Sequence, residues 1–272
     1  MPAMKLFGPI FRLSVLTLLG LVLVPLQWLS LKLELPTMRL IPMFFHRVGL
    51  PLLGVKVTGF GKVARQRPLL ICSNHVSWLD IPAISSLTRV VFVSRGDVVN
   101  WPVLGLLAKL QRTIFVDRTK RTATRTASEE ISQRLGSGDA VVLFPEGTTS
   151  DGNRVLTFRS SLLGAARAAM QGWPDENIHI QPAMIRYHGL HGLPIGRMNQ
   201  PYAAWYGDMD FVPHLIDILK LGAIEVEVHF GDVLSFPAGT DRKVMAAEVE
   251  KAVRAMRYKS FSKMRGAVTK AA

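Results

Sequence analysis

The sequence predicts an α/β fold: a single domain with a mixed, largely parallel sheet flanked by helices, joined to an N-terminal pair of membrane-associated helices. Two observations predict the domain. Short aliphatic runs alternate with helical stretches from residue 55 onward, and polar motifs follow the ends of two of these runs. A third observation, the apolar and basic start of the chain, predicts the helix pair. We therefore expect membrane-anchoring helices in residues 1–54 and the α/β domain, ending in a basic helix, in residues 55–272.

The expected strands are short runs rich in Val, Ile, Leu or Phe and bounded by Gly, Pro or Asp. They are residues 55–58, 69–73, 90–93, 113–116, 140–144, 178–185 and 224–230. Helical spacing or composition is found in residues 81–87, 101–110, 121–136, 159–171 and 241–257. A chain of 272 residues can bury a full core, and no internal repeat or long linker divides it, so we expect one domain.

The N-terminal segment has the composition of a membrane anchor. Residues 13–31 carry no charge and would span about 28 Å as a helix, just enough for a hydrocarbon core. Pro25 interrupts this run, a basic residue flanks each end, and no small-residue cleavage site follows, so we expect an uncleaved anchor. Residues 37–53 are apolar with two arginines, as in a helix lying in the interface. A spanning hairpin, a re-entrant pair, two surface helices and a helix packed on the protein's own core all remain open.

The charge distribution also favours a membrane surface. The formal net charge is +13, the hydrophobic fraction is 49% and the mean hydropathy is +0.24. Residues 1–67 hold nine Lys or Arg against one acidic residue, and residues 251–272 hold seven against none. Basic segments beside apolar ones bind anionic lipid headgroups. No groove-reading or base-stacking module accompanies the basic residues, so we expect no nucleic-acid partner.

The single cysteine and the histidines argue against metal or redox chemistry. Cys72 alone excludes an intramolecular disulfide and a Cys-x-x-Cys metal site, which favours a reducing cytosolic compartment. It lies in an apolar run, so we interpret it as a small buried hydrophobe rather than an acyl-carrying nucleophile. His188 and His191 stand in a Gly-rich loop without an acidic third ligand, so we expect no metal and no cofactor.

The first motif, Asn74-His75-Val76-Ser77-Trp78-Leu79-Asp80, directly follows an expected strand. Its spacing places His75 on a strand-to-helix turn and Asp80 in or beside the first helical turn, from which the carboxylate can reach one imidazole nitrogen. Such a pair fixes the tautomer and lets the other nitrogen take a proton from a hydroxyl that attacks a carbonyl. The alternative is structural, because Ser77-x-x-Asp80 resembles a capping box.

The second motif is Phe144-Pro145-Glu146-Gly147-Thr148-Thr149-Ser150, again directly after an expected strand. Gly147 lets a ligand approach the backbone closely, and Glu146 can accept from an acceptor hydroxyl. The oxyanion-binding candidates are the hydroxyl residues Thr148, Thr149 and Ser150. The structural alternative is a polar hairpin turn through Asp151-Gly152, and both interpretations can hold together.

A third motif, Phe115-Val116-Asp117-Arg118, ends another expected strand and is followed by Lys120 and Arg121. The Arg118 guanidinium suits a phosphate or a carboxylate bidentately. A solvated surface cluster is the alternative when this segment is read alone.

With Ile180-Gln181-Pro182-Ala183, these motifs resemble the ordered blocks of the glycerolipid acyltransferase family, which includes the bacterial 1-acylglycerol-3-phosphate acyltransferases. The likeness covers residues 55–235. It implies transfer of an acyl chain from an acyl-carrier-protein or coenzyme A thioester to a lysolipid hydroxyl, without metal or covalent intermediate. It also implies membrane lipids as partners and a place on the cytoplasmic face of the bacterial inner membrane.

The resemblance also implies residue roles. His75 would be the general base, Asp80 its orienting partner, and Arg118 an acceptor-binding residue. Glu146 and Gly147 would belong to the acceptor site, and we expect the substrate-binding set to be completed by Asn74, Thr148, Thr149 and Ser150. Two positions depart from the family pattern: Arg112 stands where the family usually has Gly, and Arg159 where it often has Lys.

Within the family, the chain resembles the lyso-ornithine lipid O-acyltransferase branch. The resemblance rests on Trp78 and on residues 148–154, 191–197 and 204–208. That branch acylates the 3-hydroxyl of a fatty acid amide-linked to ornithine, so the acceptor's ammonium would need an acid such as Asp208 or Asp210. Lysophosphatidic acid is the alternative acceptor. A hydrolase of acyl thioesters or lipid esters and a non-enzymatic membrane adaptor are the alternative functions.

Overall fold

The computed structural model describes residues 3–116, 121–170, 177–237 and 239–271. Within these residues, nine strands form one sheet, ordered β1-β8-β6-β2-β5-β3-β4 along its main path, with β7 and β9 paired to β6. The strand bounds are β1 Val55–Phe60, β2 Leu69–Ser73, β3 Val90–Arg95, β4 Ile114–Val116, β5 Ala140–Leu143, β6 Asn177–Leu190, β7 Leu193–Pro194, β8 Ile224–Phe230 and β9 Leu234–Pro237. Strands β6, β2, β5, β3 and β4 run parallel, whereas β8 is antiparallel to β6 and parallel to β1.

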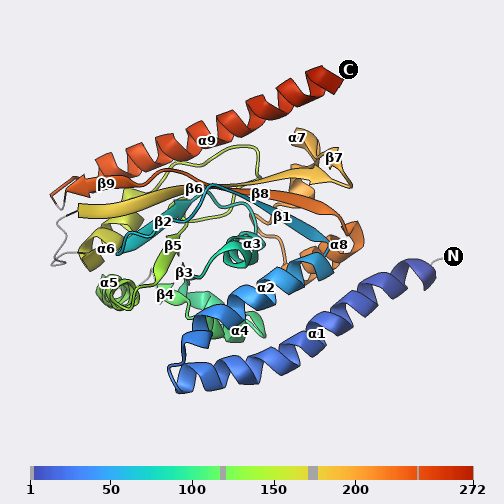
Figure 1. Cartoon of the computed structure of the whole chain (residues 1–272), viewed down its shortest axis with the longest axis horizontal. Coiled ribbons are helices and arrows are strands. Elements are labelled where there is room, and N and C mark those ends of the chain that lie inside the picture. The colour runs from blue at the N-terminus through green and yellow to red at the C-terminus, as the bar shows by residue number, and fades with distance from the viewer. Residues whose placement is uncertain (1–2, 117–120, 171–176, 238, 272) are drawn as a thin grey trace.

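Helices cover both faces of this sheet (Figure 1). Helices α5, α6 and α9 pack on one face, and α2, α3 and α8 on the other. The helix bounds are α1 Ala3–Lys32, α2 Leu40–Leu52, α3 Asp80–Leu87, α4 Leu104–Leu110, α5 Arg121–Gly136, α6 Ser160–Met170, α7 Gly196–Asn199, α8 Phe211–Leu221 and α9 Arg242–Ala271. Short 3-10 helices are η1 Pro36–Arg39, η2 Gly96–Asn100 and η3 Gln200–Tyr202.

The central strand β2 shows why the sheet lies where it does. All of its residues are buried, as expected for a parallel strand covered on both faces. Leu69 and Ile71 enter the core beneath α2, α3 and α8, while Leu70 and Cys72 enter the core beneath α5, α6 and α9. The polar residues that follow β2 therefore lie at the carboxyl end of a central strand, at one rim of the sheet.

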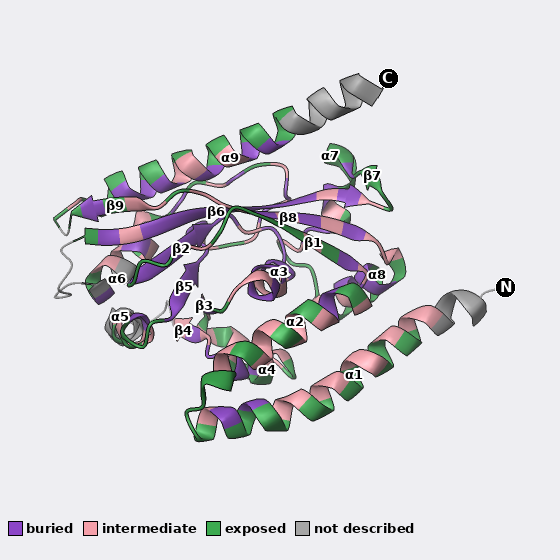
Figure 2. Cartoon of the chain, viewed as in Figure 1, coloured by how far each residue is buried: buried purple, intermediate pink, exposed green. Residues whose placement is uncertain are grey.

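Helix α1 lies outside this layered body and packs on α2. Residues Gly8–Lys32 of α1 are long and apolar enough to cross a membrane, and within this range only Gln27 and Ser30 are buried in the protein. Figure 2 accordingly shows α1 mostly exposed or half-buried. The Gln27 side chain docks the last turn of α1 by donating to the carbonyl of Leu110 at 2.7 Å. Arg47 on α2 donates to the carbonyl of Ser86 on α3 at 3.1 Å, which ties the pair to the domain.

Each strand expected from the sequence is present, but some elements were not foreseen. The expected interruption at Pro25 is wrong, because α1 runs through that proline as one helix. The two-residue β7 and the four-residue β9 are too short to give an alternating pattern, and α8 carries Pro213 within its first turn. The fold class itself, a mixed and mostly parallel sheet flanked by helices, is confirmed.

Candidate active site

The first two motifs meet at one rim of the sheet. Because β2 and β5 are parallel neighbours, the loops after their carboxyl ends lie side by side. The Phe144 ring stacks on the His75 imidazole, with the ring centroids 4.0 Å apart and the planes 12° from parallel. The backbone N–H of Ser150 also donates to the carbonyl of His75 at 2.9 Å. Residues about 70 positions apart in the chain thus form one site.

His75 and Asp80 form the pair that their spacing predicts. The Nδ1 atom of His75 lies 2.7 Å from Oδ2 of Asp80. The carboxylate fixes Nδ1 as the protonated nitrogen, which leaves a lone pair on Nε2. The His75 side chain is 19% exposed and that of Asp80 is 0% exposed, so the free nitrogen can meet a substrate while its partner stays shielded from water.

Backbone and side-chain donors hold the Asp80 carboxylate in place. Oδ2 accepts from the backbone N–H of Val76 at 2.6 Å and of Ser77 at 3.0 Å, and Oδ1 accepts from the hydroxyl of Tyr187 at 2.6 Å. Asp80 is also the first residue of α3, where a carboxylate suits the helix dipole. The structural and the catalytic interpretations of Asp80 are therefore compatible, because the bond from the Ser77 N–H to the Asp80 carboxylate is the one that the acid makes in a capping box.

Glu146 supports the backbone of the histidine loop. Its Oε2 accepts from the N–H of His75 at 3.3 Å and its Oε1 from the N–H of Leu156 at 3.0 Å. Burial raises the pKa of Glu146 to about 8, against the lowering effect of these two hydrogen bonds and of Arg254. In this structure the carboxyl group is 2% exposed and directed at the backbone, so it orders the two loops from within.

The hydroxyl residues of the second motif differ in exposure. Thr148 is exposed, Thr149 is half-buried, and Ser150 is buried with its Oγ donating to the carbonyl of His75 at 3.1 Å. Gly147 has a φ of 72°, the left-handed region that favours glycine. The chain bends at residues 152–154, where Oδ1 of Asp151 accepts from the N–H of Asn153 at 3.0 Å, and it continues into α6 and not into a hairpin strand. The two threonines are thus the hydroxyl groups placed to meet a ligand.

Asn74 lies behind the site. Its amide nitrogen donates to the carbonyl of Ile185, and its amide oxygen accepts from the N–H of the same residue, both at 2.9 Å. With 0% exposure, the side chain joins the end of β2 to β6. Contact between Asn74 and substrate stays a prediction that this placement does not favour. Arg118, the expected acceptor-binding residue, lies outside the described residues.

Several residues of the site were not predicted from the sequence. Tyr187 reaches Asp80 from 107 positions away. The Nε1–H of Trp78 donates to Nδ1 of His214 on α8 at 3.0 Å, and Arg257 on α9 donates to the carbonyl of Gly152 at 2.7 Å. No local pattern signals such contacts, because each depends on which strand or helix packs beside the rim.

Neither a metal site nor a second nucleophile accompanies the pair in the part of the chain that the structure describes. No group of three or more His, Cys, Asp or Glu side chains there could hold a metal ion. Cys72 is fully buried, and burial raises the pKa of its thiol, which keeps it protonated and inert.

The largely parallel α/β sheet, the carboxylate-oriented histidine at its rim and the apolar N-terminal helix fit a membrane-associated acyltransferase, and comparison with known proteins shows that class. The chain belongs to the Acyltransferase family, whose model matches residues 54–186. It is 46% identical over 241 residues to the lyso-ornithine lipid O-acyltransferase of Rhizobium meliloti (strain 1021), covering 89% of this chain and 82% of that protein. Its identity to the Brucella abortus (strain 2308) protein of the same name is also 46%, covering 88% and 89%.

Relatives with other names are more distant. The 1-acyl-sn-glycerol-3-phosphate acyltransferase of Neisseria gonorrhoeae is 27% identical, over 72% of each chain. The crystal structure of the 1-acyl-sn-glycerophosphate acyltransferase PlsC from Thermotoga maritima superimposes with a TM-score of 0.61, covering 94% of this chain and 97% of that one at 19% identity. That structure supports the fold alone.

Proposed function

We propose that this acyltransferase moves a fatty acyl group from acyl-carrier protein or acyl-CoA to the hydroxyl of lyso-ornithine lipid, at the cytoplasmic face of the membrane. The observation that carries the proposal is the imidazole of His75, with Nδ1 bound by a buried carboxylate and Nε2 free at the sheet rim. The identity to two lyso-ornithine lipid O-acyltransferases supports the choice of acceptor.

The reaction needs one base and no covalent intermediate. Nε2 of His75 takes the proton of the acceptor hydroxyl as its oxygen attacks the thioester carbonyl. The tetrahedral intermediate then expels the thiolate, which takes the proton back from the imidazolium, so an ester and a free thiol are formed. Asp80 stabilises the imidazolium between the two steps and does not itself change its protonation.

An acceptor-supplied nucleophile is consistent with the surroundings of the imidazole. Among the contacts of the described residues, those of the His75 ring are with Asp80 and Phe144. A hydroxyl brought by the lipid would occupy the position that the serine takes in a Ser-His-Asp hydrolase.

The acceptor site is the least defined part of this proposal. We assign the acceptor's polar headgroup to the exposed side of the second motif, where Gly147, Thr148 and Thr149 lie, with Arg118 as the expected partner of its carboxylate. Asp208 and Asp210 are exposed in the segment before α8. Because His214 on α8 bonds Trp78 of the first motif, this segment adjoins the site, and either acid is a candidate for the ornithine ammonium.

The test is transfer of a labelled acyl group by the purified full-length protein in detergent. Acyl-carrier protein is the donor, and lyso-ornithine lipid and lysophosphatidic acid are offered in parallel. We expect product mainly from lyso-ornithine lipid, and none from His75→Ala of unchanged melting temperature. Product mainly from lysophosphatidic acid would move the function to phospholipid synthesis. Free fatty acid formed at the same rate without acceptor would identify a hydrolase.

A further inference from the structure

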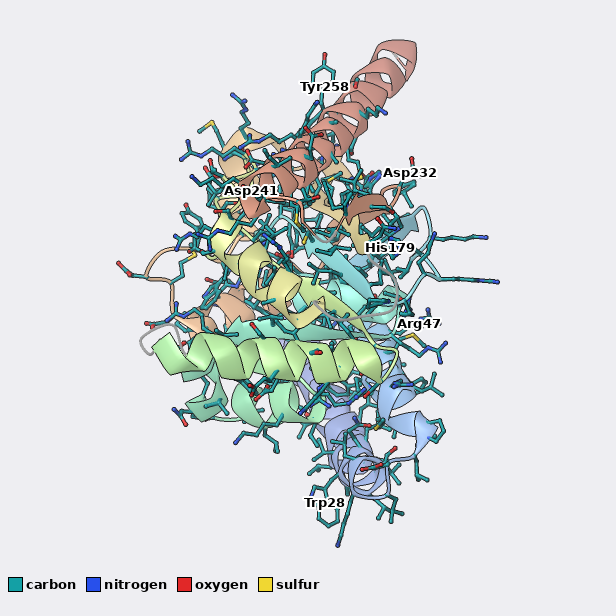
Figure 3. All side chains as sticks on the ribbon, turned by 90° about the vertical axis from the view of Figure 1, so that its left-hand side faces the viewer. Trp28, Arg47, His179, Asp232, Asp241 and Tyr258 are labelled. Carbon is teal, nitrogen blue, oxygen red and sulfur yellow. The ribbon has the colours of Figure 1, made fainter. Side chains whose placement is uncertain are left out.

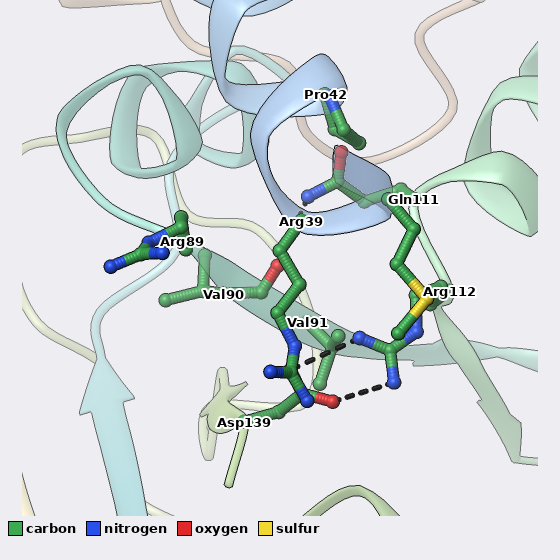
Figure 4. Close-up of a pocket in the computed structure, with 9 residues that line it drawn as sticks. Arg39, Pro42, Arg89, Val90, Val91, Gln111, Arg112 and Asp139 are labelled. Atoms are coloured by element: carbon green, nitrogen blue, oxygen red, sulfur yellow. Dashed lines mark hydrogen bonds and ion pairs between the residues drawn. The ribbon is translucent and has the colours of Figure 1, made fainter. Parts of the chain in front are cut away.

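A polar recess lies at the rim of the sheet opposite to His75. It is lined by residues at the amino ends of β3 and β5 together with Arg39 from η1 and Arg112 from the turn before β4. Figure 4 shows both guanidinium groups converging on Asp139. Arg112 bonds the carboxylate bidentately at 2.7 and 3.0 Å, and Nε of Arg39 lies 2.8 Å from Oδ1. The buried carboxylate of Asp139 thus forms ion pairs with two arginines.

Further guanidinium groups surround this recess. Arg89 is exposed at its rim, and Arg67 donates to the carbonyl of Gly138 next to Asp139. Burial lowers the pKa of Arg67, and so does the charge of Arg89, while Asp139 raises it. Burial and the charge of Arg112 likewise lower the pKa of Arg134, with Asp139 and Glu130 opposing. The guanidinium groups around the recess therefore outnumber the carboxylates. A bound anion would reduce the repulsion among these guanidinium groups.

The recess also borders the membrane helices. Arg39 itself belongs to the connection between α1 and α2. Gln27 near the end of α1 donates to the carbonyls of both Met38 and Leu110, which holds that end beside Arg112. Large apolar side chains in the same connection are exposed: Leu33, Leu35 and Leu40. These apolar side chains point outward, and the guanidinium groups beside them point into the recess. The arrangement matches the boundary of a lipid layer, where acyl chains meet phosphate groups.

We propose that this recess binds the phosphate group of an anionic phospholipid, at a site separate from the catalytic rim. The planar guanidinium group suits phosphate oxygens. Both terminal nitrogens of Arg112 are bonded to Asp139, so the phosphate binds at the mouth of the recess, to Arg89 and to a terminal nitrogen of Arg39 that Asp139 holds in place. Arg89, exposed at the rim, meets the incoming phosphate. The bound lipid then fastens the α1–α2 connection to the catalytic domain.

A lipid fits this location better than an acidic protein. The recess is concave and lies beside the end of an apolar helix whose outer side chains, such as Trp28 and Leu29, are exposed. A folded carrier protein would need a broad accessible surface, whereas here α1 and η1 occupy one side. The phosphate group of a membrane lipid would lie at the same depth as this recess, next to the end of α1.

The test measures lipid binding to the full-length protein in nonionic detergent. Dihexanoyl phosphatidylglycerol is titrated, with dihexanoyl phosphatidylcholine as the zwitterionic match, and the apparent dissociation constant is taken from the rise in melting temperature. We expect preference for phosphatidylglycerol in the wild type. Arg89→Glu should weaken that binding at least about tenfold. Lys243→Glu, the same charge change at an exposed position of α9 across the sheet, should leave it unchanged.

The readout is independent of acyl transfer, so it does not depend on the proposed reaction. Equal binding of the two lipids, or unchanged binding by Arg89→Glu, would overturn the site. An equal rise in melting temperature with inorganic phosphate at the same concentration would overturn the assignment to lipid. A rise that is sensitive to Arg89→Glu with acyl-carrier protein, and absent with phosphatidylglycerol, would assign the recess to a protein partner instead.

Discussion

At the residue scale, the Asp80 carboxylate accepts from the Nδ1–H of His75, from two backbone N–H groups and from Tyr187. The first contact sets the tautomer of the imidazole and the others fix the direction of the carboxylate. Because Asp80 is 0% exposed, water cannot replace a lost partner. The basic nitrogen of His75 is thus positioned by groups from α3, the loop before it and β6.

We predict that Asp80→Asn lowers kcat by about three to four orders of magnitude while the protein stays folded. An asparagine amide would donate to Nδ1 and leave the proton on Nε2, which is the wrong tautomer for a base. Tyr187→Phe removes one donor but keeps the tautomer, so it should lose only about tenfold. Single-turnover acyl transfer measures both. Comparable losses in the two variants would contradict the tautomer argument.

Glu146 gives the site a dependence on pH. Its folded-state pKa of about 8 lies above the usual value of 4.5, so the folded protein holds this proton more tightly than the unfolded chain. The resulting contribution to stability is complete below about pH 4.5 and is lost as the pH rises toward 8.

We predict that Glu146→Gln removes this dependence. A glutamine does not titrate, so the melting temperature of the wild type relative to that of Glu146→Gln should fall steadily between pH 5 and pH 8. Thermal unfolding of the two proteins in the same buffers measures the difference. A difference that stays constant across this range would show that Glu146 is ionised in the folded protein at every pH tested.

At the scale of elements, α9 is part of the site although it comes last in the chain. Glu250 accepts from the N–H of Phe158 at 2.8 Å, and Arg257 donates to the carbonyl of Gly152 at 2.7 Å. Both partners lie in the loop that begins with Glu146. Figure 3 shows Tyr258, further along the same helix, pointing away from the body, so α9 turns one side toward the loop and another toward solvent.

We predict that Glu250→Ala destabilises the protein by about 1–3 kcal/mol and raises the KM for the acceptor more than it lowers kcat. The reason is that the buried backbone N–H of Phe158 loses its partner and the second-motif loop loosens. Glu248→Ala is the matched control, because the Glu248 side chain is 53% exposed and contacts Lys251 only at 3.9 Å. Equal effects of the two substitutions would remove α9 from the site.

At the scale of the whole molecule, an apolar helix and a charged cluster adjoin on the same side of the sheet. Trp28 points outward from α1 in Figure 3. One side of α1 packs on α2 and α4, whereas many of its large apolar side chains are exposed. An exposed apolar helix surface of this kind is stable in lipid and not in water. The division between an anchor in residues 1–54 and a catalytic domain in residues 55–272 stays a prediction.

We predict that Val22→Arg releases much of the protein from membranes, because a charge at the centre of an apolar helix costs about 2.5–3.5 kcal/mol. Val244→Arg is the matched control: Val22 is 53% exposed on α1 and Val244 is 54% exposed on α9. Flotation with vesicles measures the bound fraction. If both variants float like the wild type, the membrane contact lies elsewhere than the centre of α1.

Much of the fold was determined locally and could therefore be predicted. The residues of β2 and β5 are nearly all aliphatic, which by itself predicts buried strands. The spacing of His75 and Asp80 brings the two side chains together across one strand end and one helical turn. The uncharged run in α1 likewise specifies an apolar helix by itself, and only its continuity through Pro25 was not foreseen.

The tertiary structure decided what depends on distant neighbours. Tyr187, Glu250 and Arg257 reach the site through the packing of β6 and α9, and no pattern in their own segments signals this. Asn74 turns inward because β6 offers it a matching N–H and carbonyl, and Arg112 is buried because Asp139 lies opposite. The sequence by itself determined the His75–Asp80 pair and the apolar helix α1, since both depend on nearby residues. Packing alone determined the partners that fix and surround them, because hydrogen bonds across the sheet have no fixed separation along the chain.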